Sequence, residues 1–285
     1  MLTNIFLISL SMTAVILILL IISPLLNNRF SAKWRYFVWL ILALRLIIPF
    51  RLEMPDAPVN ISAPKNQIII FRQEGIPLTI VDKSFVEKGN SSTGSADYAP
   101  IITLKELLTV IWAFGAVAFF LFHIISYLIF KRRIKRYCDT VNSDIIQNVL
   151  DDMKIKRKPQ FLKCSKIASP MMIGFFKPMI LLPDAEYSNN EFSVILKHEL
   201  THYKRCDIWY KLLLVIANSV HWFNPLVYLM ARRANRDLEY FCDDVVVKNS
   251  DINYRKEYSM AILKAMQSVE ATTLSTYLNG GKKNG

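Results

Sequence analysis

The residues from Ile5 to Ile22 form an almost unbroken apolar run without a charged side chain, long enough to cross a bilayer as one helix. A second run covers residues 36–50 and contains Arg45, and a third falls within residues 105–130. A signal peptide is the competing interpretation of the first run, but no basic segment precedes it and no small-residue cleavage site follows it. We therefore expect three spans, at about 5–23, 36–50 and 105–130, in a membrane domain of residues 1–130.

The formal net charge of +12 is concentrated beside these runs. Arg29, Lys33 and Arg35 stand between the first two runs, and five cations occupy residues 131–136, directly after the third. Such charges mark the cytosolic side of membrane spans, and no helix-turn-helix or aromatic-basic interleaving indicates nucleic-acid binding. We expect a multi-pass plasma-membrane protein in contact with the lipid bilayer and with no direct nucleic-acid partner. Its N-terminus and the loop 51–102 are then outside, and residues 131–285 are cytosolic.

Beyond residue 130 the pattern changes to that of a domain with both helices and strands, which we assign to residues 131–285. Residues 134–153 are expected to form a helix, and residues 160–167 and 179–182 to form strands of a small sheet. Part of the segment 170–183 can serve as an edge strand that binds a substrate backbone, and a structural hairpin is an equally good interpretation. The sequence alone identifies no other substrate-binding residue.

The cysteines carry no pairing signal. The chain has four of them, without a CxxC spacing: Cys138, Cys164, Cys206 and Cys242. This pattern fits neither a disulfide framework nor a zinc ribbon. Because the domain that contains them is expected in the cytosol, we expect reduced thiols.

Two histidines, His198 and His202, stand four residues apart on a helix that Ser188 is expected to cap. Four residues complete about one helical turn, so both side chains can reach one metal ion. Glu199, directly after the first histidine, can reach a water on that ion. This spacing is typical of a catalytic Zn2+ site, with Glu199 as the general base that accepts a proton from the attacking water.

Catalytic zinc needs a third protein ligand and one open position. A later helix, expected over residues 232–249, carries Glu239 and Asp243 on one face. His221 is a competing ligand, but Glu239 fits better. We expect His198, His202 and Glu239 to hold Zn2+, and Asp243 to accept a hydrogen bond from a ligand histidine.

Further candidates near this site remain open. Asp207 and Asp244 are weaker candidates for supporting the ligands, since helix capping or solvent exposure accounts for each of them. The donor that stabilises the oxyanion can be Arg236, Tyr240 or Tyr258, and the sequence does not choose among them.

The apolar stretch 208–230 has the length of a fourth span. If it crossed the membrane, Glu239 would lie outside while His198 stayed inside, although both must reach one ion. We therefore expect two helices broken at Asn224-Pro225, forming a membrane-associated hairpin.

Several motifs occur together along the chain: LIIPFR at 46–51, SPMMIGFFKPMILLP at 169–183, HELTHYKRCD at 198–207, WFNP at 222–225 and EYFCD at 239–243. In this combination the chain resembles the BlaR/MecR-type antirepressor family of integral-membrane zinc peptidases. The resemblance implies a mainly α membrane protein whose cytosolic α+β zincin-like (gluzincin) metallopeptidase domain contains a small β-sheet. It implies a bacterial cell membrane, metal ligation by His198, His202 and Glu239, and catalysis by Glu199. It also implies that a cell-envelope, antibiotic-type signal is relayed by self-cleavage and by inactivation of a transcriptional repressor.

The beta-lactam sensors of that family continue into another span and a penicillin-binding domain, whereas this chain ends at Gly285 without a Ser-x-x-Lys motif of that type. We expect a relative without the sensor domain, one that depends on a separate sensor partner or a homodimer, or a truncated product. A general quality-control metalloprotease is the alternative within enzymes. A non-catalytic signalling scaffold is the alternative outside them, although a scaffold has no need for an intact HExxH motif.

Overall fold

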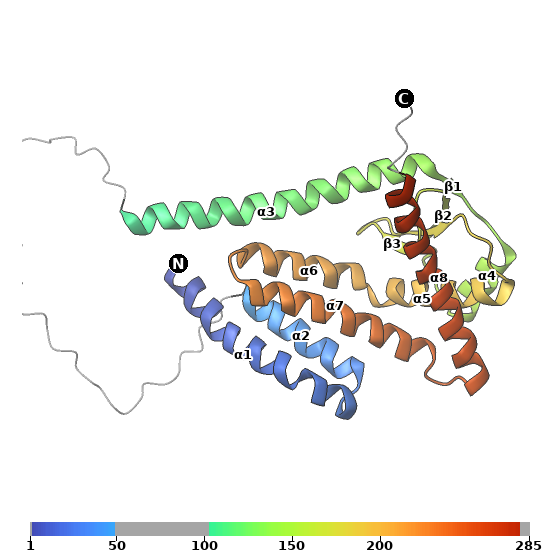
Figure 1. The fold of residues 1–285 in the computed structure, drawn as a ribbon, viewed down its shortest axis with the longest axis horizontal. Coiled ribbons are helices and arrows are strands. Elements are labelled where there is room, and N and C mark those ends of the chain that lie inside the picture. Colours follow the sequence, from blue (N-terminus) through green and yellow to red (C-terminus); the bar gives the residue numbers. More distant parts are fainter. Residues whose placement is uncertain (1, 49–102, 280–285) are drawn as a thin grey trace, which may run out of the picture.

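The computed structural model describes residues 2–48 and 103–279, so the expected loop 51–102 lies outside the described residues. The fold is mainly helical with one small sheet (Figure 1). Its elements are α1 (Leu2–Arg29), α2 (Ala32–Ile47), α3 (Leu104–Ile134), a 3-10 turn (Lys135–Tyr137), β1 (Cys138–Thr140), α4 (Asp144–Asp152), β2 (Gln160–Cys164), β3 (Met171–Ile173), β4 (Met179–Pro183), α5 (Asn189–Arg205), α6 (Asp207–Val220), α7 (Pro225–Val246) and α8 (Ile252–Asn279).

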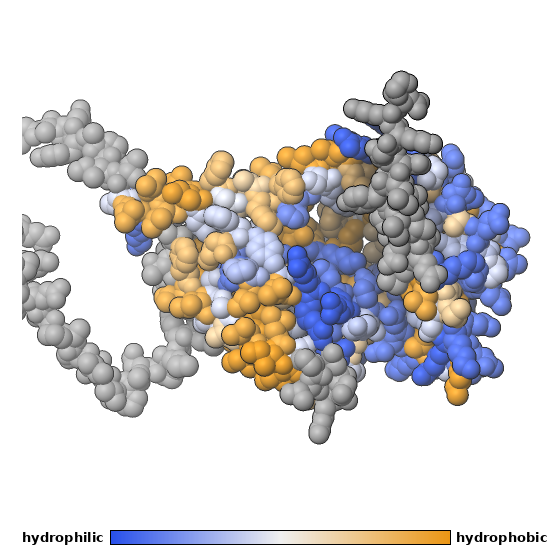
Figure 2. Space-filling model, in the orientation of Figure 1, coloured by the Kyte–Doolittle hydropathy of each residue, from blue (hydrophilic) through white to orange (hydrophobic). Residues whose placement is uncertain are grey.

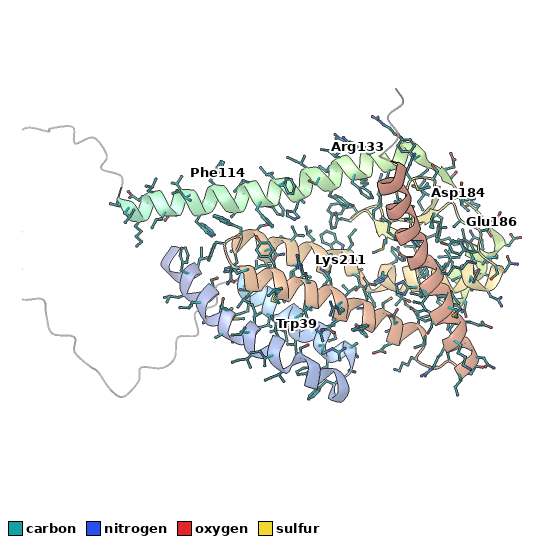
Figure 3. All side chains as sticks on the ribbon, in the orientation of Figure 1. Trp39, Phe114, Arg133, Asp184, Glu186 and Lys211 are labelled. Atoms are coloured by element: carbon teal, nitrogen blue, oxygen red, sulfur yellow. A yellow bond between two sulfur atoms is a disulfide. The ribbon has the colours of Figure 1, made fainter. Side chains whose placement is uncertain are left out.

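Within residues 2–48 and 103–279, two helices are long and apolar enough to cross a membrane, judged by length and composition: the segment Ile5–Ser23 of α1 and the segment Leu104–Tyr137, which contains α3. Apolar side chains cover this part of the surface, and polar side chains gather around the sheet and α4 (Figure 2). On α3, Phe114 lies within the apolar part and Arg133 near the basic end (Figure 3). The expected span at 36–50 stays a prediction, because α2 has 16 residues and is about 24 Å long, against about 30 Å of hydrocarbon.

A buried ion pair joins α2 to α7. Arg35 Nε donates to Asp237 Oδ1 at 2.9 Å, and the indole N–H of Trp39 donates to Asp237 Oδ2 at 2.8 Å. Asp237 is fully buried. Trp39 of α2 belongs to the apolar cluster that α2 forms with α1 and α7 (Figure 3). Arg35, which was expected in a short basic loop between the first two runs, is therefore part of α2 and pairs inside the helical bundle. Because Glu239 follows two residues later on α7, this pair also helps to position the predicted third ligand.

The sheet has the strand order β1-β2-β4-β3, with β2 and β4 parallel and the two outer pairs antiparallel. The predicted strands at 160–167 and 179–182 are confirmed as β2 and β4. The predicted helix 134–153 is wrong in its first half, where the chain leaves α3 through a 3-10 turn, forms β1 and then starts α4. One cause is Ser143, whose hydroxyl accepts from the Ile145 N–H and caps α4 as a separate helix.

Cys138 and Cys164 form a disulfide between β1 and β2. The two residues are direct partners in the antiparallel register, and Cys164 is fully buried. The prediction of reduced thiols is therefore wrong for this pair, because a strand register that places them side by side cannot be read from their spacing in the sequence. Cys206 and Cys242 remain free thiols.

Helix α5 packs on the sheet through Leu196 and Leu200, which join Phe161, Ile180 and Leu182 in one apolar cluster. Its start is fixed by the predicted capping box. Ser188 Oγ accepts from the Glu191 N–H at 3.3 Å, and the Glu191 carboxylate accepts from the Ser188 N–H at 2.8 Å. Lys264 of α8 pairs with Glu191 at 2.9 Å, and Tyr258 of α8 packs on α5 beside Val194, so α8 lies across α5.

Helices α6 and α7 form the predicted hairpin, with the break at Asn224 and Pro225 confirmed. The Asn224 side-chain amide donates to the hydroxyls of Ser9 and Thr13 on α1. Trp222 Nε1 donates to the Trp112 carbonyl on α3 at 3.3 Å. The tip of the hairpin thus contacts both candidate spans. Helix α7 is longer than predicted and continues without interruption to Val246, so the hairpin and the helix that carries Glu239 are one element.

Candidate metal centre

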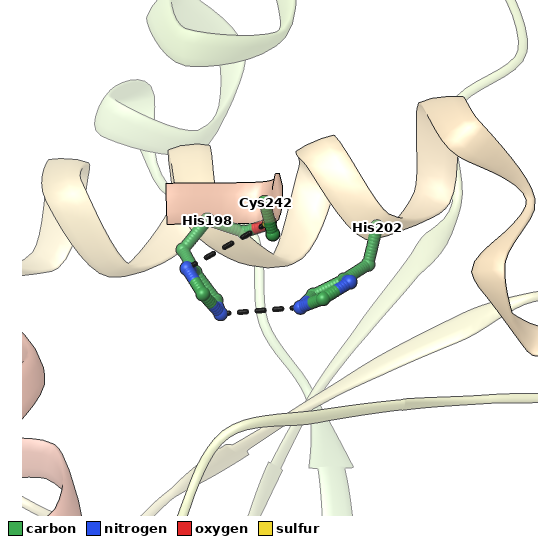
Figure 4. A group of neighbouring side chains, drawn as sticks. All are labelled: His198, His202 and Cys242. Carbon is green, nitrogen blue, oxygen red and sulfur yellow. Dashed lines mark hydrogen bonds between the residues drawn. The ribbon is translucent and has the colours of Figure 1, made fainter. Parts of the chain in front are cut away.

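Helix α5 places His198 and His202 on one face, one turn apart. Their Nε2 atoms are 3.1 Å apart, and both rings are largely buried, as predicted from their spacing (Figure 4). Their Nδ1 atoms make separate contacts with other residues. The Nε2 atoms are therefore the pair that converges on one point.

The structure brings Glu239 of α7 to the same point. Its Oε2 atom lies 3.1 Å from His202 Nε2 and 3.7 Å from His198 Nε2. A tetrahedral zinc ion with bonds of about 2.0–2.1 Å separates its ligand atoms by about 3.3 Å. The three atoms thus have the mutual spacing that one such ion requires. Lys211 of α6 contacts the other oxygen of Glu239, Oε1, at 3.4 Å.

Cys242 forms a second group with the two histidines, and the sequence did not single it out. Its sulfur lies 3.8 Å from His198 Nδ1, and its thiol donates to the His198 carbonyl at 3.5 Å (Figure 4). Ligand atoms of these three residues all lie within 4.8 Å of one another, which makes them a possible metal-binding group. The sulfur, however, approaches His198 from the Nδ1 side, away from the point where the Nε2 atoms converge.

Asp207 contacts His202, although the sequence ranked it as a weaker candidate for supporting a ligand. Its Oδ2 atom lies 2.7 Å from His202 Nδ1, and Asp207 is 1% exposed. Cys206 adopts a left-handed conformation with φ 58°, so that α5 ends and α6 begins within one residue. This turn folds Asp207 back onto α5. A positive φ at a cysteine cannot be read from sequence, so the contact could not have been anticipated.

Asp243 lies beside His198, and Tyr258 of α8 contacts both of them. The Asp243 carboxylate lies 3.4 Å from His198 Nδ1. Tyr258 Oη lies 2.7 Å from the same nitrogen and donates to Asp243 Oδ1 at 2.5 Å. Tyr258 therefore contacts the Nδ1 side of the ring, whereas the other two candidates for the oxyanion donor, Arg236 and Tyr240, line the cavity.

The electrostatics of the site favour positive charge. Burial by itself lowers the pKa of His202, but hydrogen bonds to Asp207 and neighbouring groups outweigh it and raise this pKa to about 11. The pKa of His198 is raised in the same way, chiefly by Asp243. Burial raises the pKa of Glu239, but hydrogen bonds to both histidines hold it far below its usual range. The acidic groups thus stabilise a cation at this position.

Glu199 is buried beside the histidines and lines a cavity of about 480 Å³. Burial raises the pKa of its carboxyl, and the histidines partly oppose this effect. Met171 and Met172 of β3 form one wall, and Arg236 and Tyr240 of α7 also line the cavity. In the strand order β3 stands at one end of the sheet, so among the described residues it pairs with β4 alone. His221 lies elsewhere, with Nε2 3.1 Å from the Leu46 carbonyl, so it does not join the site.

The model of the BlaR1 peptidase M56 family matches residues 3–284. The chain belongs to this family. Membership in the M56 peptidases supports a metallopeptidase role and agrees with the resemblance drawn from the motifs.

Several curated relatives are similar to this M56 peptidase over most of its length. The regulatory protein BlaR1 of Bacillus licheniformis is 24% identical over 264 residues, covering 87% of this chain and 43% of the relative. BlaR1 of Staphylococcus aureus is 24% identical over 284 residues, covering 94% of this chain and 47% of the relative. The methicillin resistance mecR1 protein of Staphylococcus aureus is 25% identical over 247 residues, covering 80% of this chain and 40% of the relative. The chain thus spans less than half the length of these relatives.

Proposed function

We propose that this chain is a membrane-embedded zinc endopeptidase that relays a cell-envelope signal by cytosolic proteolysis, through self-cleavage and inactivation of a transcriptional repressor. The observation that carries the proposal is the convergence of His198 Nε2, His202 Nε2 and Glu239 Oε2 at distances of 3.1–3.7 Å. Membership in a peptidase family and relatives named for regulation and methicillin resistance support the regulatory part.

In this proposal His198, His202 and Glu239 bind zinc, and Asp207 and Asp243 orient the two histidines. Glu239 is a better third ligand than Cys242, because its oxygen faces the Nε2 atoms while the cysteine sulfur faces Nδ1. Two neutral imidazoles and one carboxylate leave a position for water and a net positive charge. When bound, the zinc lowers the pKa of that water and polarises the substrate carbonyl.

Glu199 accepts the proton of the attacking water and transfers it to the leaving amine. Its burial raises the pKa of the carboxyl, which makes the carboxylate a stronger base for this proton. The substrate backbone pairs with the outer edge of β3, whose Met171 and Met172 form the wall beside Glu199. Backbone pairing of this kind selects an extended segment of the substrate protein with little dependence on its sequence.

The membrane part of the proposal rests on α1 and α3 as spans, with α2 as the third. The basic residues 131–136 follow the apolar part of α3 and keep that end cytosolic. The tip of the α6–α7 hairpin contacts both α1 and α3, so α7, which carries Glu239, is held against the spans. The N-terminus is then outside, and the metal centre is on the cytosolic side.

The proposal is tested by comparing proteomes of cells that express the wild type or Glu199→Ala. The variant is expected to retain zinc, to accumulate uncleaved chain and to leave the repressor intact. The matched control is Glu186→Ala, since Glu186 is exposed and remote from the cavity (Figure 3). Undiminished cleavage in Glu199→Ala rejects the mechanism. Cleavage of many unrelated membrane proteins and no repressor favours the quality-control alternative.

A further inference from the structure

The loop between β3 and β4 presents aromatic rings to the surface. Phe176 is 77% exposed, and Trp209 of α6 beside it is 43% exposed. The ring centroids of Phe176 and Trp209 are 5.5 Å apart, as are those of Phe175 and Trp209. Tyr127 of α3 lies 5.3 Å from Phe175. Residues from three separate elements thus form one aromatic group, which we call the aromatic tip: Tyr127, Phe175, Phe176 and Trp209.

The backbone beneath the exposed rings is held in place. The Gly174 N–H donates to Tyr127 Oη at 2.8 Å, and Arg157 donates to the Phe176 carbonyl at 3.3 Å. Gly174 has φ +94°, and a Cβ there would collide with the Lys177 carbonyl, so the turn requires glycine. Because these contacts fix the backbone of the loop, the Phe176 side chain stays exposed. Large apolar groups held outward on a fixed backbone are typical of an interaction surface.

The aromatic tip lies where the surface changes from apolar to basic. Tyr127 is one turn before Lys131, at which the basic residues 131–136 begin. Trp209 is in the first turn of α6, before the apolar helix that runs to the hairpin tip. Figure 2 shows the change from apolar to polar surface along the same direction, and Arg133 marks the basic end of α3 in Figure 3. Lys177 follows Phe176 and is exposed, so one cation also stands next to the exposed ring.

We propose that the aromatic tip inserts into the cytosolic interface of an anionic phospholipid bilayer and thereby holds the edge strand β3 at the membrane surface. Aromatic rings prefer the headgroup level of membranes, and flanking cations bind anionic lipids of the cytosolic leaflet. The loop that inserts is continuous with β3, which forms the wall of the cavity beside Glu199. The inference rests on the proposed membrane location. It adds the position of β3, the proposed substrate-binding strand, relative to the membrane surface.

Depth is measured with a nitroxide label on Phe176→Cys in the full chain, reconstituted in nanodiscs of phosphatidylglycerol and phosphatidylcholine. The background is Cys206→Ser, which removes the exposed free thiol, since Cys242 is buried. Accessibility of the label to oxygen and to a water-soluble nickel complex gives its depth. The matched control is Asp184→Cys, at an exposed residue directly after β4 (Figure 3).

The label at position 176 is expected to be accessible to oxygen and shielded from nickel, and more strongly so as the anionic lipid fraction rises. The label at position 184 is expected to be accessible to nickel throughout. Equal nickel accessibility at both positions overturns the proposal. Shielding of position 176 from both reagents also overturns it, because a protein partner or a second copy of the chain then covers the tip. The same measurement on Glu199→Ala does not depend on cleavage, so a failed protease proposal would not mimic either outcome.

Discussion

Tyr258 Oη lies 2.7 Å from His198 Nδ1, so a residue of α8 contacts a predicted metal ligand of α5. When Nε2 binds metal, Nδ1 carries the proton and donates to Tyr258, whose own hydroxyl donates to Asp243. The three groups therefore form one chain of hydrogen bonds that fixes the tautomer of His198. Because Lys264 also ties α8 to Glu191, α8 contacts α5 at its first turn and at its metal site.

Tyr258→Phe removes one hydroxyl and keeps the ring that packs against Val194. We expect zinc affinity to fall by about tenfold, since partners that orient a metal ligand are typically worth 10–100-fold. The measurement is zinc competition against a fluorescent chelator. Tyr254→Phe, one turn earlier on α8, is the control and is expected to leave affinity unchanged. Equal affinity in Tyr258→Phe and wild type would show that Asp243 alone orients His198.

Asp207→Ala removes the buried carboxylate that orients His202. Zinc affinity or activity is expected to fall by about 10–100-fold, because the imidazole loses the partner of its non-ligating N–H. Asp244→Ala is the matched control, since Asp244 is exposed on α7. Zinc content and peptide cleavage are measured side by side on both variants. A loss in Asp244→Ala as large as that in Asp207→Ala contradicts the assignment.

Glu239→Ala and Cys242→Ser distinguish the two possible metal-binding groups. We expect Glu239→Ala to lose stoichiometric zinc, and Cys242→Ser to retain it, because only the glutamate oxygen faces both Nε2 atoms. Zinc per chain is determined by elemental analysis after dialysis. Chelation is expected to lower the Tm of the wild type and of Cys242→Ser, since a ligand that binds only the folded state stabilises it. The reverse pattern would assign the third ligand to the cysteine.

Much of the site was predictable because its residues follow helical spacing. His198, Glu199 and His202 lie within one turn, and the requirement that Glu239 reach the same ion predicted the break at Asn224 and Pro225. The contacts that were missed depend on tertiary geometry. Asp207 reaches His202 only through the left-handed turn at Cys206.

The missed disulfide between Cys138 and Cys164 and the role of Tyr258 have a similar origin. The disulfide depends on a strand register, and Tyr258 reaches His198 only because α8 crosses α5. Local spacing carries no information on either arrangement, because each is set by how distant segments pack.

Arg35→Met leaves the buried Asp237 without its principal cation. Breaking a buried ion pair by removing one partner costs about 3–5 kcal/mol, which corresponds to a fall in Tm on the order of 10 °C. The fall in Tm is measured by thermal unfolding of the protein in nanodiscs. The double variant Arg35→Met/Asp237→Leu is expected to recover part of the loss, since the fully buried carboxylate is gone and the Arg233 that it also pairs with is partly exposed. A double variant no more stable than the single one would show that the ion pair is not the source.

Gly115→Leu tests whether close packing holds α3 on the hairpin. A Cβ at Gly115 would overlap the indole of Trp222, which donates to α3 through the Trp112 carbonyl. The larger side chain must push α3 away from the hairpin tip and break this contact, at a typical overpacking cost of about 1–3 kcal/mol. Ala118→Leu is the control, because Ala118 is exposed on the same helix. Trp222 fluorescence, taken as the difference from Trp222→Phe, is expected to change in Gly115→Leu and not in Ala118→Leu. If both variants left it unchanged, glycine at this position would serve no packing role, and α3 would be held through other contacts with α6.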